Sequence, residues 1–189
     1  IPNGIETIEK DVFSSNSISS LYFNNQLKTI GEKAFYGNKN IKSVYLRESI
    51  ETIENKAFAL NEMLENVIIT SNKISIKEKA FYNCKKLKNV IITSEESIEI
   101  DSNVFDKSGI ETIYISNKYT KELPKLSSNV GIKQIETGKC GEECIYTFNS
   151  TNGLLSIYGT GELKAFDSSL TTDKMKEIKE IKITSSIGN

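Results

Sequence analysis

A phenylalanine that recurs at nearly constant intervals constrains the fold of this chain more than any other feature. Phe13, Phe35, Phe58, Phe81 and Phe105 are separated by 22, 23, 23 and 24 residues. A second position, five residues before each phenylalanine, is always isoleucine: Ile8, Ile30, Ile53, Ile76 and Ile100. Such a period is typical of solenoids, in which repeats stack because one repeat cannot bury its own apolar face. We therefore expect the phenylalanines to form one continuous buried column.

A second motif follows each phenylalanine after five or six residues. It reads ISSLYF, IKSVYL, LENVII, LKNVII and IETIYI. This apolar-x-x-apolar-x-apolar spacing is that of the strand segment of a leucine-rich repeat. Its last positions alternate and carry β-branched or aromatic residues, as a short half-buried strand requires. The prediction is a β-rich α/β leucine-rich-repeat solenoid, with short parallel strands on the concave face and short helical turns on the convex side.

Two repeats carry a resemblance to a known family. LKTIGEKAFYGNKNIKSVYL and KEKAFYNCKKLKNVII resemble the BspA-like class of leucine-rich repeats, and Cys84 stands where that family often has a cysteine. The resemblance extends over residues 1–116, although the proline that usually follows each strand is missing after most of them. Members of that family are found on the surfaces of mucosal bacteria and parasitic protists, where they are associated with attachment to host cells and matrix. The resemblance therefore implies a secreted or cell-surface, adhesin-like protein.

The repeat pattern divides the chain into three parts. Residues 1–137 form the array, with about five repeats of 22–24 residues and a degenerate closing turn. Residues 138–175 form a β-hairpin module, because IYTF and LLSIY are two strand segments joined by a turn that contains Asn-Gly. Part of it, residues 138–166, resembles a short module that accompanies such arrays. Residues 176–189 read as the start of a further repeat.

Composition argues against several kinds of function. The chain has no histidine, which removes the commonest general base and the commonest metal ligand. Its net charge of −1 gives no basic field for nucleic acid, and no apolar run is long enough to enter a membrane. The carboxylates recur at equivalent positions of the repeats, which indicates a solvent-exposed face of the solenoid and not a catalytic pair. We expect no enzymatic activity, no cofactor and no bound metal.

Two features could carry covalent modifications. Cys140 and Cys144 lie four residues apart, and either a local disulfide or two free thiols fits this spacing. Cys84 is expected to be a small buried apolar residue. Asn149 begins an Asn-Ser-Thr sequon and is a candidate glycosylation site.

The candidate binding surface is the outward side of the predicted strands. Side chains alternate along a strand, so the residues between the inward apolar positions face outward. The candidate partner-binding residues are Tyr22, Tyr45, Arg47, Ile68, Ile91 and Tyr114. An exposed apolar ridge that carries tyrosines suits recognition of a host or matrix protein. The alternative is that tyrosine and isoleucine stand there for β-propensity alone.

Two other functions stay open at this point. One is an architectural spacer, which would need no coherent apolar column on one face. The other is glycan binding by residues 138–175, in which Tyr146 and Tyr158 would stack on sugar rings.

Overall fold

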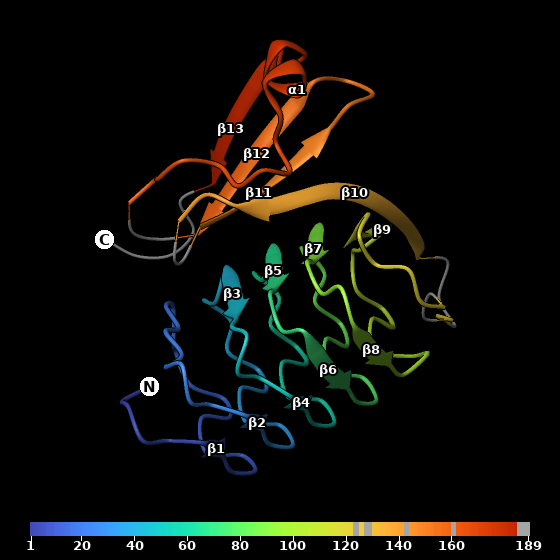
Figure 1. The fold of residues 1–189 in the computed structure, drawn as a ribbon. Helices are drawn as coiled ribbons and strands as arrows, with labels where there is room; N and C mark the ends of the chain where they lie inside the picture. Colours follow the sequence, from blue (N-terminus) through green and yellow to red (C-terminus); the bar gives the residue numbers. More distant parts are fainter. Residues whose placement is uncertain (123–124, 127–129, 142–143, 160–161, 185–189) are drawn as a thin grey trace.

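The chain folds into a two-sheet β-solenoid whose C-terminal strands turn back over one of the sheets (Figure 1). The computed structural model describes residues 1–122, 125–126, 130–141, 144–159 and 162–184. Within these ranges no helix is long and apolar enough to cross a membrane.

The first sheet contains five short parallel strands, one from each repeat. In spatial order they are β1 (Thr7–Ile8), β2 (Thr29–Ile30), β4 (Thr52–Ile53), β6 (Lys73–Ile76) and β8 (Ser97–Ile100). Each of these strands ends at the isoleucine that lies five residues before the recurring phenylalanine of its repeat.

The second sheet contains eight strands and begins with the predicted strand motifs. These are β3 (Ser43–Leu46), β5 (Asn66–Ile69), β7 (Asn89–Ile92) and β9 (Thr112–Ser116), which pair in parallel. The register aligns equivalent residues, so Val44, Val67, Val90 and Ile113 form one inward column. The parallel strands predicted for this face are therefore present from the second repeat onward.

The phenylalanines stack between the two sheets as the period predicts. Phe35, Phe58, Phe81 and Phe105 are buried, and consecutive rings lie 5.2–5.7 Å apart with interplanar angles of 5–8°. Phe13, at the end of the stack, lies 5.3 Å from Phe35 and is only half-buried. Stacked rings of this kind add to the stability given by burial of their area.

The helical turns predicted for the convex side are wrong. The described residues contain a single short α-helix, α1 (Thr172–Lys176), and it lies outside the array. Lys56 and Leu60, two residues either side of Phe58, have φ angles of 55° and 59°, which a right-handed helix does not allow. The N–H of Phe58 donates to the carbonyl of Ala80 in the next repeat at 2.8 Å, instead of to its own repeat. Tight turns and inter-repeat hydrogen bonds thus take the place of helices.

The second sheet continues into the C-terminal part of the chain. β10 (Gly131–Lys139) pairs in parallel with β9 through residues 131–135 and antiparallel with β11 (Cys144–Asn149) through residues 136–139. The predicted boundary between residues 137 and 138 therefore falls inside one strand. Residues 123–124 and 127–129 of the predicted closing turn lie outside the described residues.

The predicted hairpin is present after β10. β11 and β12 (Leu154–Gly159) pair antiparallel, and Gly153 takes a φ of 73° in the turn between them. β13 (Glu180–Thr184) adds in parallel to β12, within the stretch interpreted as the start of a further repeat. The remainder of that stretch, residues 185–189, lies outside the described residues.

Candidate functional site

The C-terminal strands cover the middle of the surface that the sequence identified as a binding ridge. Ile68 and Ile91 do face outward from β5 and β7, but each is only 1% exposed. They form a small apolar cluster with Ile145 of β11 and Tyr158 of β12, which face each other in the hairpin register. The prediction that Ile68 and Ile91 are exposed is therefore wrong, because a segment about 70 residues later in the chain packs on them.

The other residues of the ridge differ in their exposure. Tyr45 and Tyr114 are half-buried at the edges of the same cluster. Tyr22 lies beyond the covered region and is 44% exposed. Arg47, beside Tyr45, is partly exposed, and its Nη1 donates to Oδ1 of Asn25 at 2.9 Å.

The opposite face of the hairpin has its own core. Tyr146, Phe148, Leu155 and Ile157 pack there with the cysteines, Phe166 and Leu170. The Tyr146 hydroxyl donates to Asp167 at 3.1 Å, and burial together with that carboxylate raises the pKa of the phenol well above its usual value. Tyr146 is fully buried and Tyr158 is 8% exposed, so neither ring is available to a sugar. The glycan-stacking hypothesis for residues 138–175 is wrong for this reason.

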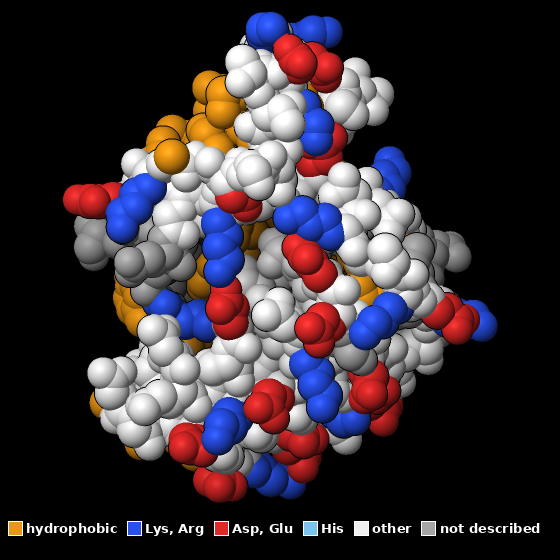
Figure 2. Space-filling view, in the orientation of Figure 1, with side chains coloured by type: hydrophobic (Ala, Val, Ile, Leu, Met, Phe, Trp, Pro, Cys, Tyr) orange, Lys and Arg blue, Asp and Glu red, His pale blue; other side chains and the backbone are white. Residues whose placement is uncertain are grey.

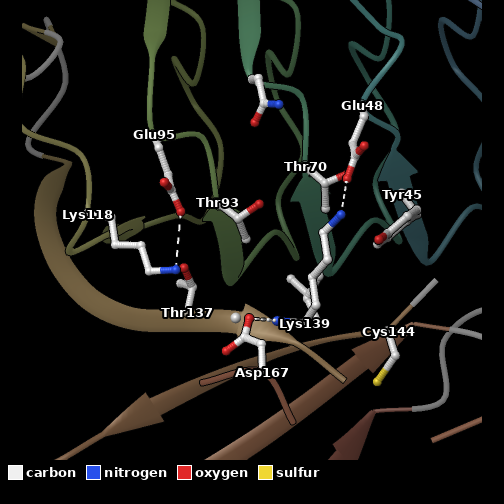
Figure 3. Close-up of a pocket in the computed structure, with 13 residues that line it drawn as sticks. Tyr45, Glu48, Thr70, Thr93, Glu95, Lys118, Thr137, Lys139, Cys144 and Asp167 are labelled. Carbon is white, nitrogen blue, oxygen red and sulfur yellow. Dashed lines mark hydrogen bonds and ion pairs between the residues drawn. The ribbon is translucent and has the colours of Figure 1, made fainter. Parts of the chain in front are cut away.

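A cleft of about 300 Å³ remains between the concave sheet and β10 (Figure 3). Its floor comes from the ends of β3, β5 and β7, with Tyr45, Thr70 and Thr93. Its roof comes from β10 and the residues that follow, with Thr137, Lys139 and Asp167 among them. Sequence reasoning missed this cleft because it forms only when residues far apart in the chain come together.

Two ion pairs lie at this cleft. Lys139 of the roof pairs with Glu48 of the array at 2.6 Å, and Lys118 pairs with Glu95 at 3.3 Å. Asp167 accepts hydrogen bonds from the backbone N–H of Lys139 at 2.6 Å and of Ser169 at 2.9 Å. Burial by itself would raise the pKa of the Asp167 carboxyl, but these hydrogen bonds outweigh burial and lower it.

A second hollow of about 360 Å³ lies on the other side of Lys139. It is lined by Asn25, Tyr45, Arg47, Glu48, Ser49, Thr70 and Lys139. This hollow adjoins the uncovered end of the ridge, where Arg47 projects.

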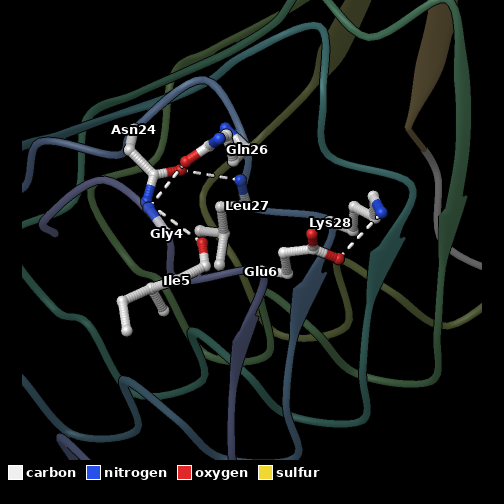
Figure 4. A network of polar contacts seen from close by, with 7 residues as sticks. All are labelled: Gly4, Ile5, Glu6, Asn24, Gln26, Leu27 and Lys28. Atoms are coloured by element: carbon white, nitrogen blue, oxygen red, sulfur yellow. Dashed lines mark hydrogen bonds and ion pairs between the residues drawn. The ribbon is translucent and has the colours of Figure 1, made fainter.

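Asn24, two residues after Tyr22, has a structural role (Figure 4). Its amide nitrogen donates to the carbonyls of Pro2 and Ile5, and its oxygen accepts from the backbone N–H groups of Gln26 and Leu27 at 2.8 and 2.7 Å. These contacts fix the first repeat against the second, so the exposed Tyr22 stands next to an ordered, hydrogen-bonded turn.

The three cysteines separate into two environments. Cys140 and Cys144 are joined by a disulfide that closes the loop between β10 and β11. Cys84 is fully buried, and desolvation raises the pKa of its thiol to about 12. Among the described residues, no group of histidine, cysteine, aspartate or glutamate side chains could hold a metal ion.

Asn149, the candidate glycosylation site, is the last residue of β11. It is half-buried, and its side-chain oxygen accepts from the N–H of Thr151 at 3.0 Å. Glycosylation at this position stays a prediction.

Comparison with known families identifies the repeat. The model of the BspA-type leucine-rich repeat region matches in six copies, over residues 6–129 and 55–170. The chain belongs to the BspA-type leucine-rich-repeat family. Searches of the curated proteins and of the solved structures return no significant match. The family match extends through β12, so the hairpin is included in the region that this BspA-type chain shares with the family model.

Proposed function

We propose that this chain is a non-catalytic binding module of a secreted or cell-surface protein, and that it recognises a partner protein through the uncovered end of its concave face. The observation that carries the proposal is the contrast in exposure among the residues of the predicted ridge. Ile68 and Ile91 are covered by the hairpin, whereas Tyr22 is 44% exposed and lies beyond the covered region. The binding surface is accordingly shorter than the full ridge and consists of Tyr22, Tyr45 and Arg47.

The chemistry of this surface supports protein recognition. Tyrosine and arginine are enriched at the centres of protein interfaces, because both offer large contact area together with hydrogen-bond donors. The hollow of about 360 Å³ beside Tyr45 and Arg47 gives a concave place into which a partner side chain can insert. Acidic and basic side chains are interspersed over the face of the molecule seen in Figure 2.

Family membership supports the class of partner. Leucine-rich repeats typically mediate protein interactions, and BspA-like proteins are associated with attachment to host cells and matrix. A host-cell or extracellular-matrix protein is therefore the proposed partner, and a spacer array is the alternative.

Binding to a panel of immobilised matrix proteins tests the proposal. The variants are Tyr22→Ala and Arg47→Ala, and the matched control is Tyr36→Ala, a half-buried tyrosine at a turn after Phe35. Loss of a central interface residue costs about 2 kcal/mol or more, so the first two variants should bind at least roughly tenfold more weakly than the control. Equal binding by all three variants would place the site elsewhere, and no binding to any panel member would favour the spacer.

A further inference from the structure

We propose that the cleft between the concave sheet and β10 is a binding site for a small, neutral, polyhydroxylated ligand, with a mono- or disaccharide as its chemical class. The site shares Tyr45 with the protein-binding surface proposed above but contains neither Tyr22 nor Arg47. Its volume of about 300 Å³ lies at the lower end of the range for small-molecule sites. Its position also differs from the hairpin tyrosines, which are buried.

The charge of the cleft argues for a neutral ligand. Lys118 and Lys139 lie at hydrogen-bonding distance from Glu95 and Glu48, so the ammonium groups are already balanced. The lining carries two lysines and three carboxylates, Asp167 included, which gives a formal sum of 2 − 3 = −1. A phosphate or sulfate would meet no excess of positive charge there, and charge-assisted contacts of the kind that hold such anions would first require an ion pair to break.

The uncharged groups of the lining argue for hydroxyl-bearing ligands. Thr70 and Thr93 follow adjacent strands of the array, and Thr137 lies opposite them on β10; Figure 3 shows the array side above and β10 below. Thr70 donates its hydroxyl proton to the carbonyl of Leu46 at 3.4 Å, and Thr137 donates to Oγ of Ser116 at 2.9 Å. Thr70 and Thr137 are only 7% and 3% exposed and their hydroxyl groups bond within the protein, so the partly exposed Thr93 is the threonine that offers its hydroxyl to a ligand.

Apolar groups contribute little to this lining. The hydrophobic residues in it are Tyr45, Cys144 and Ile145, and Cys144 is part of a disulfide. A lipid or an unsubstituted aromatic ligand would cover polar side chains such as Thr93 and Asn72 without offering them hydrogen bonds, which is costly in a partly desolvated cleft. A sugar offers both donors and acceptors to these groups, and the half-buried Tyr45 also lines the cleft.

The ion pair between Lys139 and Glu48 favours a compact ligand over an extended peptide. It joins roof and floor at 2.6 Å and lies between this cleft and the neighbouring hollow, since both residues line both cavities. An extended chain that ran through both would have to separate the pair. A monosaccharide or disaccharide fits on one side of it.

Nuclear magnetic resonance titration of the whole chain with glucose, galactose, N-acetylglucosamine, lactose and maltose tests the proposal. We expect at least one sugar to shift the backbone amide signals of residues that line the cleft, with Thr93 and Thr137 among them. Thr93→Val should weaken that sugar about tenfold or more, because it removes a hydroxyl and keeps the shape of the side chain. The matched control is Thr112→Val, in β9 of the same sheet but outside the cleft lining.

Three outcomes would overturn the proposal: no shift with any sugar, shifts confined to residues outside the cleft, or equal affinity of Thr93→Val and the parent chain. Thermal unfolding of both variants checks that they are folded. Thr93 and Thr112 lie outside the surface formed by Tyr22, Tyr45 and Arg47. Loss of sugar binding in Thr93→Val and loss of protein binding in Tyr22→Ala or Arg47→Ala are therefore separate results.

Discussion

The Nζ atom of Lys139 lies 2.6 Å from Oε1 of Glu48, which is 91 residues earlier in the chain. This contact joins the C-terminal strands to the second repeat of the array. Because the sheet continues from β9 into β10 and then turns back, the pair marks the place where β10 approaches the far edge of the array beside β3.

The ion pair between Lys139 and Glu48 is expected to stabilise this arrangement only slightly. The two side chains are 62% and 55% exposed, and ion pairs of this kind contribute under about 1 kcal/mol. Lys139→Met should lower the free energy of unfolding by that amount at low salt and by less at high salt, as denaturant unfolding would show. Lys176→Met, which removes a pair with Asp173 inside α1, is the control. A loss several times larger and independent of salt would contradict this account.

The burial of Ile91 under the hairpin predicts a large effect of truncation. Ile91→Ala should lower the free energy of unfolding by about 2–5 kcal/mol, because it leaves a cavity beside Tyr158. Tyr22→Ala, at an exposed residue outside the region that the hairpin covers, should change it by less than about 0.5 kcal/mol. Denaturant unfolding of the two variants measures the contrast, and equally small effects would mean that the hairpin does not cover Ile91.

The phenylalanine stack predicts a gradient along the solenoid. Phe58 is fully buried between two stacked rings, at 5.2 and 5.4 Å, so Phe58→Ala should cost about 3–5 kcal/mol of unfolding free energy. Phe13 is half-buried with one stacked neighbour, and Phe13→Ala should cost less. Thermal unfolding curves of both variants test this order. A larger loss of stability for Phe13→Ala than for Phe58→Ala would contradict it.

Cys84 is expected to be inert in the folded protein. The thiolate is the reactive form, and a thiol pKa of about 12 keeps the group protonated at pH 9. Iodoacetamide at that pH should therefore modify Cys84 only after denaturation, as mass spectrometry would detect. Rapid modification of the native chain would show that the thiol is accessible.

The same pKa shift predicts how stability depends on pH. Above the ordinary thiol value of 9.0 the unfolded chain loses the Cys84 proton, whereas the folded chain keeps it up to about 12. The contribution of this group to stability is therefore complete below pH 9.0 and declines as the pH rises toward 12. Cys84→Ala should remove this part of the pH dependence in denaturant unfolding, and an unchanged pH profile would argue against it.

The repeat period was sufficient to predict the core. Equal spacing of the phenylalanines places each one at the same point of its turn, and the structure stacks them. The motif LENVII likewise predicted β5 and its parallel neighbours. These features depend on interactions between adjacent repeats, which the local sequence encodes.

The hairpin itself was predicted, but its packing on the concave face was not, because contacts between β11–β12 and β5–β7 leave no periodic signal. One local sign was present. Val67, Ile68 and Ile69 form an unbroken apolar run, as do Val90, Ile91 and Ile92, whereas the equivalent residues in β3 are Val44, Tyr45 and Leu46. Continuous apolar runs are typical of parallel strands that are buried on both faces, so the runs indicate which strands are covered.

The convex side was mispredicted for a different reason. A short polar turn such as Glu54-Asn55-Lys56 is compatible with a helical turn in isolation. Its left-handed lysine and its hydrogen bonds to the next repeat are properties of the stacked array.

The central claim is that the chain covers the middle of its own concave face and leaves only the Tyr22 end for a partner. Nuclear Overhauser contacts between the methyl groups of Ile91 and the ring protons of Tyr158 measure this most directly. The account predicts contacts from Ile68 and Ile91 to Tyr158 and Ile145, and none from Tyr22 to either. Absence of every contact between the isoleucines and the hairpin would contradict it, and would return the whole ridge to the candidate binding surface.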